Sequence, residues 1–326
     1  MDLSLVIPVW NDLPGLDRLL KQVADFGIFS QVIVVDDASD IPPGPETVAS
    51  ATALADRITW LRSDRQRGAG HARNMALEHV RSSHMIFFDS DDLFTDEFPR
   101  IAEHAGARTE PFDFLIFRHD DSRMLDAGGW GSFPSEEKHW QTSRATEIPT
   151  QLTLDRAAVL CRLSNYPWNK IYRTDFLREN DIRCTETMVH NDVELHWNSF
   201  VTARSILTCA LPGAVHFVQE GGARLTNRRS AARLEVFRAL ANVMPRITTD
   251  PLPQRLAFLY PFTRFSCDLI HWISNNIDED DQPELRDRAR RHFLASLDRR
   301  LMTLIAYTDP ALARKINRLV LQGELP

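Results

Sequence analysis

The sequence predicts an α/β protein with a mostly parallel sheet flanked by helices, followed by a helical C-terminal appendage. Two observations support this prediction. Over roughly the first third of the chain, short apolar runs alternate with segments of helical periodicity, which is the pattern of βαβ units and a parallel sheet. From about Ser230 to the end, apolar residues recur at helical spacing.

The individual elements follow from local patterns. The run 32–35 is apolar and β-branched at every position, which is typical of a parallel strand buried on both faces. Asn11 or Asp12 can cap a helix that has a proline near its first position. The expected strands are 3–7, 32–35, 58–61, 85–88 and 112–117, and the expected helices start after Asp12, at about Glu46 and after Gly70.

Carboxylates follow two of these strands directly. Asp36 and Asp37 end the second strand, and Asp89, Asp91 and Asp92 follow the fourth. The carboxyl ends of parallel strands meet at one sheet edge, where ligands bind, and a buried carboxylate needs a partner or a metal. Oxygen ligands favour magnesium, manganese or calcium over zinc. Taken in isolation, the second cluster fits a solvated acidic turn that caps the next helix equally well.

The middle of the chain is less regular. Residues 119–149 show no sustained period and contain a glycine-rich stretch, so we expect a surface insertion that can cover the site. Regular structure is expected again beyond Pro149, including short strands over 206–209 and 214–218. Asp192 directly precedes an apolar helical run and is therefore expected at a helix N-terminus.

Composition excludes several classes of protein. The 326 residues are 43% hydrophobic and 25% charged, as in ordinary soluble globular proteins. A net charge of -7 gives no basic footprint for nucleic acid. The four cysteines are scattered, Met1 opens directly into a strand without a basic leader, and no apolar run is long enough to span a bilayer. These features predict a cytoplasmic protein without a signal peptide.

Four stretches together resemble family-2 glycosyltransferases of the GT-A (Rossmann-like) fold. They are 6–11 (VIPVWN), 34–39 (VVDDAS), 72–74 (ARN) before 88–92 (FDSDD), and 168–172 (WNKIY) before Asn191 and Asp192. Their order and spacing cover about the first 220 residues. The resemblance divides the chain into a catalytic domain over 1–228 and a helical domain over 229–326, the latter expected to serve acceptor recognition, assembly or membrane proximity.

The resemblance implies a nucleotide-sugar donor, most often a UDP-sugar, and inversion at the anomeric carbon. Asp37 is expected to accept a hydrogen bond from the base, with Asp36 as its structural partner. The residues expected around the donor are Pro8, Val9, Asn11, Asp37, Arg67, Arg73, Asp89, Ser90 and Arg224. A basic loop that the family usually has is replaced here, and Arg224 or His216 is expected to hold the diphosphate instead.

The resemblance also implies a divalent cation, Mn²⁺ or Mg²⁺, and a general base. Asp91 is the best candidate ligand, with Asp92 and His216 beside it, although His216 also fits a satisfied core histidine. Asp192 matches the base, and Asn191 stands where the family usually has Glu. Chemistry agrees with these assignments, because a diphosphate leaves only when its charge is neutralised and a sugar hydroxyl attacks when a carboxylate takes its proton. A plain helix cap is the alternative for Asp192.

The acceptor is expected to be a glycan or a lipid-linked glycan of a bacterial surface polysaccharide. Trp168, Asn169 and Lys170 are candidates to contact it, although core packing explains the tryptophan equally well. The helical part carries an aromatic stripe over 258–272 and an amphipathic last segment over 312–320. Both favour contacts within the protein or between subunits of a homo-oligomer, with peripheral contact to an anionic membrane as the alternative.

Two other functions compete with a glycosyltransferase. A nucleotidyltransferase also combines an α/β sheet with metal-binding carboxylates, but it would show a glycine-rich, basic phosphate loop after the first strand. The sequence Pro-Val-Trp-Asn at that place is not such a loop, and the absence of GxGxxG also argues against a dinucleotide-dependent oxidoreductase. A non-catalytic sugar-nucleotide-binding protein is the remaining alternative, and retention of both the acidic cluster and Asp192 argues against it.

Overall fold

The computed structural model describes residues 1–218, 230–249 and 253–325. Within them, nine strands form one mixed sheet in the order β3-β2-β1-β4-β8-β6-β9-β5, with β7 paired to β9. The strands are β1 (Leu3–Val9), β2 (Gln31–Asp36), β3 (Ile58–Arg62), β4 (His84–Phe87), β5 (Leu93–Phe94), β6 (Phe114–Asp121), β7 (Thr150–Gln151), β8 (Lys170–Arg173) and β9 (Ile206–His216). The α/β prediction is confirmed.

Helices cover both faces of the sheet. The helix α1 begins after Asp12, whose carboxylate accepts the Gly15 N–H at 3.1 Å, so Asp12 and not Asn11 is the cap. The helical elements up to β9 are α1 (Leu13–Phe26), the 3₁₀ helix η1 (Ala49–Leu54), α2 (Ala69–Leu77), α3 (Phe98–Gly106), α4 (Ser122–Asp126), α5 (Pro134–Ser143), α6 (Leu154–Leu160), α7 (Thr174–Glu179) and α8 (Val193–Thr202).

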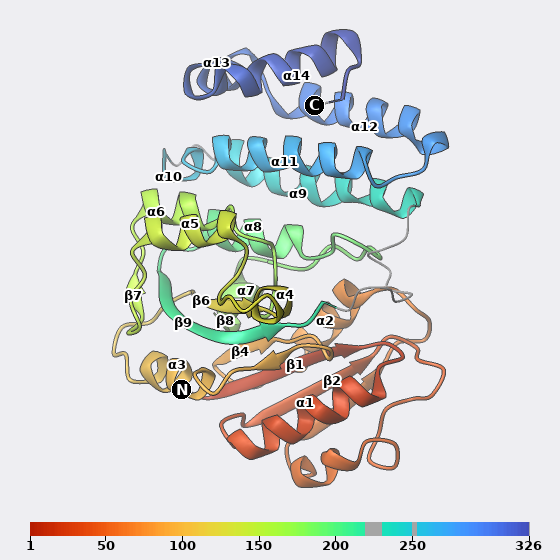
Figure 1. The fold of residues 1–326 in the computed structure, drawn as a ribbon, viewed down its shortest axis with the longest axis vertical. Coiled ribbons are helices and arrows are strands. Elements are labelled where there is room, and N and C mark those ends of the chain that lie inside the picture. Colours follow the sequence, from red (N-terminus) through yellow and green to blue (C-terminus); the bar gives the residue numbers. More distant parts are fainter. Residues whose placement is uncertain (219–229, 250–252, 326) are drawn as a thin grey trace.

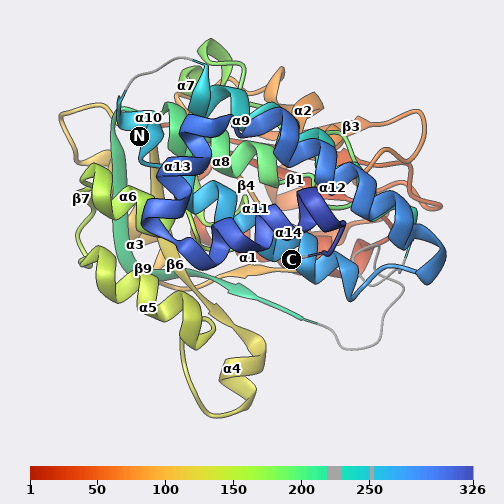
Figure 2. The same ribbon diagram turned by 90° about the horizontal axis from the view of Figure 1, so that it is seen from above.

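The C-terminal part is helical throughout its described residues, as expected. Figure 1 shows α9 and α11 lying over α8, with α12, α13 and α14 as a further layer, and Figure 2 shows this outer layer from above. The elements are η3 (Ala231–Glu235), α9 (Val236–Thr248), α10 (Pro253–Leu256), α11 (Leu259–Ser274), η4 (Glu279–Asp281), α12 (Gln282–Ser296), α13 (Arg299–Thr308) and α14 (Pro310–Gln322).

Strand register places the acidic residues at one edge. In the parallel half of the sheet, Val9 of β1 is opposite Asp36 of β2, and Val6 is opposite Phe87 of β4. The chain after β2 and the chain after β4 therefore leave the sheet on the same side. Side chains alternate between two apolar clusters, with Val6 facing one and Ile7 the other.

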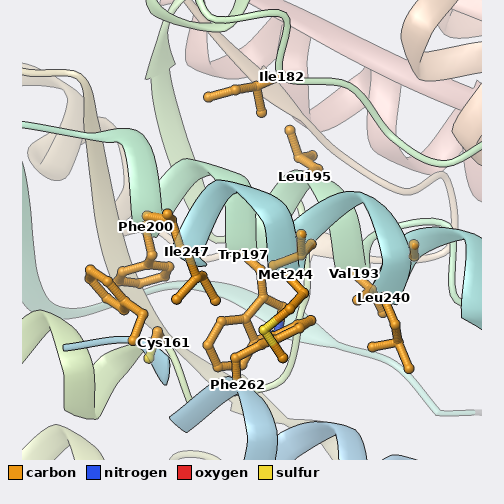
Figure 3. Packing of buried hydrophobic residues seen from close by; sticks show 14 of the residues in the cluster. Cys161, Ile182, Val193, Leu195, Trp197, Phe200, Leu240, Met244, Ile247 and Phe262 are labelled. Atoms are coloured by element: carbon orange, nitrogen blue, oxygen red, sulfur yellow. The ribbon is translucent and has the colours of Figure 1, made fainter. Parts of the chain in front are cut away.

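One apolar cluster joins the sheet to the C-terminal helices. It runs from Phe87 on β4 through Phe200 on α8 to Leu240 on α9 and Phe262 on α11, and Figure 3 shows α8 and α9 interleaving their buried side chains. Most of the expected apolar faces of the helical part belong to this cluster: Phe258 and Phe262 of the aromatic stripe are buried in it, and Leu312, Ile316 and Leu319 are 0–2% exposed, whereas Trp272 at the end of the stripe is 44% exposed. The last helix therefore docks onto its own protein through the face once considered for a membrane.

Three expectations about local structure are wrong. The segment 119–149, expected to be an irregular insertion, contains regular secondary structure: β6 continues to Asp121 opposite His216 of β9, and α5 follows. The two short strands expected over 206–218 are the single strand β9, whose Pro212 and Gly213 are accommodated by register shifts opposite the end of β6. A Cβ at Gly213 would lie 2.5 Å from the Phe117 ring, so glycine here permits close packing and does not end the strand.

The third error concerns the segment after β2. The helix expected at about Glu46 is the short 3₁₀ helix Ala49–Leu54. Its first turn is held from outside, since the Ser50 N–H donates to the Asp17 carboxylate of α1 at 2.8 Å. The strand expected over 112–117 is shifted to Phe114–Asp121. These shifts leave the carboxyl edge of the parallel strands unchanged.

Candidate active site

Asp37 fixes the loop that precedes α2. Its two carboxylate oxygens accept the Arg67 N–H at 2.9 Å and the Gly68 N–H at 2.7 Å. Gly68 has φ 88°, and a Cβ there would lie 2.8 Å from the Thr187 carbonyl oxygen, so only glycine suits this turn. Asp37 therefore lies at the predicted edge, and its contacts within the chain are to backbone N–H groups.

The neighbouring loops at this edge are joined by hydrogen bonds. The Asp40 N–H donates to Asn11 Oδ1 at 2.8 Å and Asn11 Nδ2 donates back to Asp40 at 3.1 Å. Asp36 accepts the Ser39 N–H at 2.8 Å and forms an ion pair with Arg62. Pro8 and Val9 are buried in β1 directly before this loop. The structure thus gathers the residues predicted for the nucleoside pocket.

The Asp-Ser-Asp-Asp turn after β4 distributes its side chains to different partners. Asp89 accepts from Arg73 at 2.6 Å, and Ser90 Oγ donates to Asp12 at 2.7 Å. Asp92 is 1% exposed and accepts the Phe217 N–H at 2.8 Å. The half-buried Asp91 accepts an Arg18 hydrogen bond on its backbone carbonyl at 2.8 Å. The turn is therefore built into the protein and is not a solvated acidic turn.

His216 closes one side of the site. Its Nδ1 lies 3.1 Å from Asp92 Oδ1, and its ring stacks on Trp168 with centroids 5.6 Å apart. Burial lowers the pKa of His216, but the hydrogen bond and charge of Asp92 outweigh burial and raise it above its ordinary value. The pKa of Asp92 is itself raised, mainly by burial. The pair therefore presents a histidine that is readily cationic at the sheet edge.

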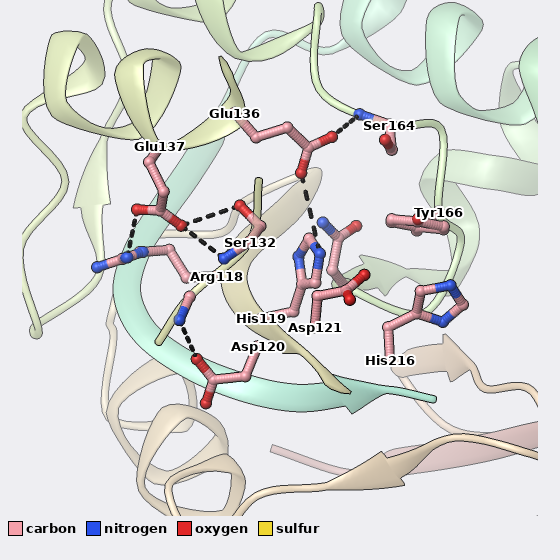
Figure 4. Close-up of polar contacts among 12 residues, drawn as sticks. Arg118, His119, Asp120, Asp121, Ser132, Glu136, Glu137, Ser164, Tyr166 and His216 are labelled. Atoms are coloured by element: carbon pink, nitrogen blue, oxygen red, sulfur yellow. Dashed lines mark hydrogen bonds and ion pairs between the residues drawn. The ribbon is translucent and has the colours of Figure 1, made fainter. Parts of the chain in front are cut away.

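A second polar cluster supports His216 from behind (Figure 4). Tyr166 packs on the His216 ring with centroids 4.9 Å apart, and His119 meets Tyr166 edge-on at 5.4 Å. Glu136 accepts the Ser164 N–H at 2.7 Å and lies 3.9 Å from His119. Burial lowers the pKa of His119 to about 3, so it is neutral. Sequence reasoning missed this cluster because its members come from segments far apart in the chain.

A divalent cation fits this edge if the donor supplies part of its ligands. In the part of the chain that the structure describes, no three His, Cys, Asp or Glu side chains gather as a metal-binding set. Asp92 and His216 bond to each other, and Asp89 bonds to Arg73. Magnesium and manganese sites often use one or two carboxylates plus substrate phosphate oxygens. Asp91, on the same turn, is suited to such a site, and its role as a ligand stays a prediction.

Asp192 lies at the N-terminus of α8, as predicted. Its side chain makes no capping hydrogen bond, which removes the plain cap as the explanation for an aspartate here. Burial raises the pKa of Asp192, and the nearby Arg73 guanidinium opposes that shift without cancelling it. Desolvation is therefore the largest influence on the pKa of this carboxyl group, larger than the opposing charge of Arg73.

Arg73 connects the loop before α8, which carries Asn191, to the acidic turn after β4. Its guanidinium donates to Asn191 at 2.7 Å and to Asp89 at 2.6 Å, and it is 3% exposed. Asn191 is adjacent to Asp192, so one arginine ties the residue before Asp192 to the first carboxylate of the acidic turn. No sequence signal could have revealed the pair, since Arg73 and Asn191 are 118 positions apart.

The three candidate acceptor residues are buried beneath the site. Trp168 and Asn169 are 1% exposed, and Lys170 is 0% exposed. Lys170 donates to the Tyr166 carbonyl at 2.6 Å and to Asn169 at 2.7 Å, and burial lowers its pKa to about 7. The expectation of direct acceptor contact is corrected here, because side chains without exposed surface cannot stack on a sugar. They support the wall that carries His216.

The remaining predicted residues have different outcomes. Arg67 forms an ion pair with Glu186 at 2.6 Å, and His71 lies 3.1 Å from the same carboxylate. The Glu186 carboxylate is thus engaged by Arg67, His71 and, at 3.4 Å, by Asn74 Nδ2. Arg224 lies outside the described residues, and its role in holding the diphosphate stays a prediction.

The part of the chain that carries most of the site matches a known protein family. The family model "Glycosyl transferase family 2" matches residues 4–156, the part that carries the nucleoside loops, Arg73 and the acidic turn. This segment belongs to glycosyltransferase family 2. The resemblance seen in the sequence is confirmed over this segment.

Two named relatives agree with this family. The chain is 27% identical over 191 residues to the poly(ribitol-phosphate) beta-N-acetylglucosaminyltransferase TarS of Staphylococcus aureus, covering 58% of the chain and 30% of that protein. It is 32% identical over 109 residues to the succinoglycan biosynthesis protein ExoO of Rhizobium meliloti, covering 32% and 30% of the two chains. The chain thus matches less than a third of the length of either relative.

The solved structures confirm the GT-A fold. The crystal structure of S. aureus TarS 1–349 in complex with UDP-GlcNAc superposes with a TM-score of 0.76 at 18% identity, covering 99% of this chain and 89% of that one. The same TarS fragment in complex with UDP gives a TM-score of 0.73 at 18% identity, with the same coverage. The likeness includes the C-terminal helices. None of the helices among the described residues has the length and hydropathy needed to cross a bilayer.

Proposed function

We propose that the protein transfers a sugar from a UDP-sugar, of which UDP-N-acetylglucosamine is the first to test, to a hydroxyl group of a surface polysaccharide or lipid-linked glycan at the cytoplasmic side of the membrane. The single observation that supports this most is the Arg73 bridge, which sets Asn191, and with it Asp192, against Asp89 of the donor edge. A transferase needs its base and its donor site in one place, and this arrangement provides that.

The names of the relatives supply the substrate classes. TarS is named as a poly(ribitol-phosphate) N-acetylglucosaminyltransferase and ExoO as a succinoglycan biosynthesis protein. A TarS structure contains UDP-GlcNAc. Both names belong to the synthesis of extracellular polymers, which supports a polymer hydroxyl as the acceptor here.

The proposed reaction is a single displacement. Ionised Asp192 accepts the proton of the acceptor hydroxyl while the hydroxyl oxygen bonds to the anomeric carbon. At the same time the bond from that carbon to the diphosphate oxygen breaks, and its electron pair stays on the diphosphate. The products are the glycoside with inverted configuration, the protonated carboxyl group and UDP. No protein nucleophile is required.

The leaving diphosphate needs positive charge. His216, whose pKa is raised above its ordinary value by Asp92, is suited to hold a phosphate oxygen at the open edge. Asp91, together with the diphosphate, would hold the divalent cation, which supplies charge neutralisation of the leaving group when bound. Arg73 positions Asp89 for the donor sugar and Asn191 for the base.

Calorimetry with UDP-GlcNAc and with UDP, with and without Mn²⁺, tests this proposal. We expect saturable binding of both, tighter with Mn²⁺, and slow release of UDP from UDP-GlcNAc by hydrolysis. A panel of other UDP-sugars in the same assay identifies the preferred donor. If no UDP-sugar and no nucleoside diphosphate binds in the presence of Mn²⁺, the proposed function is wrong.

A further inference from the structure

Resting on the proposed function, we infer that the C-terminal helices position the general base, with Trp272 of α11 as the positioning residue that acts on Asp192 through His190. We call residues 183–192, between α7 and α8, the base segment. The sequence predicts that the helical part serves acceptor recognition, assembly or membrane proximity, and its contacts with the base segment indicate this additional role.

On one side, the base segment is fixed to α2. Cys184 and Asn74 exchange two hydrogen bonds, each 2.9 Å long, between the cysteine backbone and the asparagine side chain. Gly70 of α2 lies so close that an added Cβ would be 2.4 Å from the Thr185 carbonyl oxygen and 2.8 Å from the Asn191 Cβ. This side of the segment is therefore held by the catalytic part itself.

On the other side, the base segment meets α9. Arg238 donates to the Glu186 carbonyl at 3.3 Å. Asn242 donates to the Glu194 carboxylate at 3.0 Å, and the same carboxylate accepts the Thr185 hydroxyl at 2.7 Å. Two residues of α9 thus contact the segment before the base and the first turn of the helix after it.

Trp272 contacts the residue two positions before the base. Its ring meets the His190 ring edge-on, with centroids 5.9 Å apart, and the Arg233 guanidinium lies 4.5 Å from the Trp272 ring centroid. His190 has φ 56°, a strained conformation for a residue other than glycine. Its Nε2 is buried and has no hydrogen-bond partner among the described residues, so the edge-on contact with Trp272 is an interaction that can hold this ring.

A continuous set of contacts leads from this tryptophan to the donor edge. His190 precedes Asn191, which accepts from Arg73 at 2.7 Å, and Arg73 donates to Asp89 at 2.6 Å. A shift of His190 therefore moves Asn191 and Asp192 together. Because Asp89 is also held by its own turn, the donor site is expected to move less than the base.

The test compares Trp272→Ala with the full-length parent protein. Trp272 is 44% exposed, so its removal is expected to leave the fold intact. We expect kcat for Mn²⁺-dependent hydrolysis of UDP-GlcNAc to fall by about 10- to 100-fold, the usual effect of misplacing a reacting group by about 1 Å. The Kd for UDP should change less than about threefold. Trp272→Phe should restore most of kcat, and Leu294→Ala, an exposed change on α12, should act as the parent.

Amide hydrogen exchange gives a readout that does not require a substrate. The Thr185 N–H, bonded to the Asn191 carbonyl at 3.0 Å, should exchange about tenfold faster in Trp272→Ala. The Cys184 N–H, held by Asn74, should change less. Unchanged exchange at Thr185 together with unchanged kcat would overturn the inference. Faster exchange in a protein that binds no nucleoside diphosphate would instead overturn the proposed function and leave the coupling in place.

Discussion

The donor edge and the base segment are held in place by different means. At the donor edge, Asp37 and Asp92 accept backbone N–H groups at 2.7–2.9 Å; Asp37 directly follows β2, and Asp92 lies between β4 and β5. The base segment has no strand beneath it and depends on α2 on one side and on α9 and α11 on the other. The donor site is thus fixed by the sheet, whereas the base is fixed by packing between distant parts of the chain.

The largest expected effect separates the base from the donor edge. Asp192→Asn should lower kcat by about 10²–10⁴-fold, because the amide cannot accept the hydroxyl proton. The Kd for UDP should stay near the parent value, since the donor edge is untouched. Steady-state kinetics and calorimetry measure the two quantities. Asp175→Asn, at an exposed aspartate of α7, is the matched control and should keep the parent rate, and a near-parent rate in Asp192→Asn would place the base elsewhere.

The pH profile of the parent protein sharpens the same point. Because burial raises the pKa of Asp192, the base becomes protonated at a higher pH than an ordinary aspartate, and kcat should fall on acidification from that higher pH. The raised pKa also affects stability: the ionised carboxylate is less favourable in the folded than in the unfolded state, so its ionisation lowers the free energy of unfolding. Thermal unfolding of Asp192→Asn at neutral pH is therefore expected at or above the parent temperature.

The second prediction addresses the donor edge alone. Asp91→Asn should abolish the enhancement of donor binding by Mn²⁺, because the amide keeps one oxygen ligand but loses the charge that compensates the cation. Calorimetric titration of UDP with and without Mn²⁺ measures this enhancement. Metal-independent binding should persist at the parent level. An unchanged response to Mn²⁺ would show that Asp91 does not hold the cation.

The third prediction breaks the link between the two regions. Asn191→Ala leaves the buried Arg73 guanidinium without one acceptor, which costs about 1.5–3 kcal/mol for a hydrogen bond to a charged group. Chemical denaturation measures this loss, and kcat should fall by about tenfold. Asn275→Ala, at the exposed residue directly after α11, is the control. Parent stability in Asn191→Ala would mean that Asp89 alone is enough to hold Arg73.

The smallest expected effect concerns Lys170 beneath the site. Its folded pKa is about 7, against an ordinary value of 10.5, so between these values the unfolded chain binds more protons than the folded protein. Stability should therefore rise with pH in this window, by up to about 1.4 kcal/mol per pH unit. Lys170→Met should remove this rise. Denaturation curves at pH 7, 8 and 9 compare the slopes, and equal slopes would contradict the buried, titrating lysine.

The sequence by itself determined the parallel half of the sheet and the sheet edge at which its carboxylates gather. Runs such as 32–35 are apolar at every position and can only be buried on both faces, and Asp36, Asp37 and the acidic turn directly follow such runs. The sequence also placed Asp192 at a helix N-terminus. These features depend on residues that are neighbours in the chain, where local periodicity and turn chemistry decide the outcome.

Only the tertiary structure decided what those residues contact. Arg73 reaches Asn191 across 118 positions, Trp272 lies against His190, and Trp168, Asn169 and Lys170 are buried where an exposed acceptor surface was expected. Each such contact contributes little free energy alone, and its partner is selected when whole helices pack through one shared apolar cluster. The position of Asp192, the proposed base, is therefore expected to depend on the C-terminal helices, because they complete the packing around the segment that carries it.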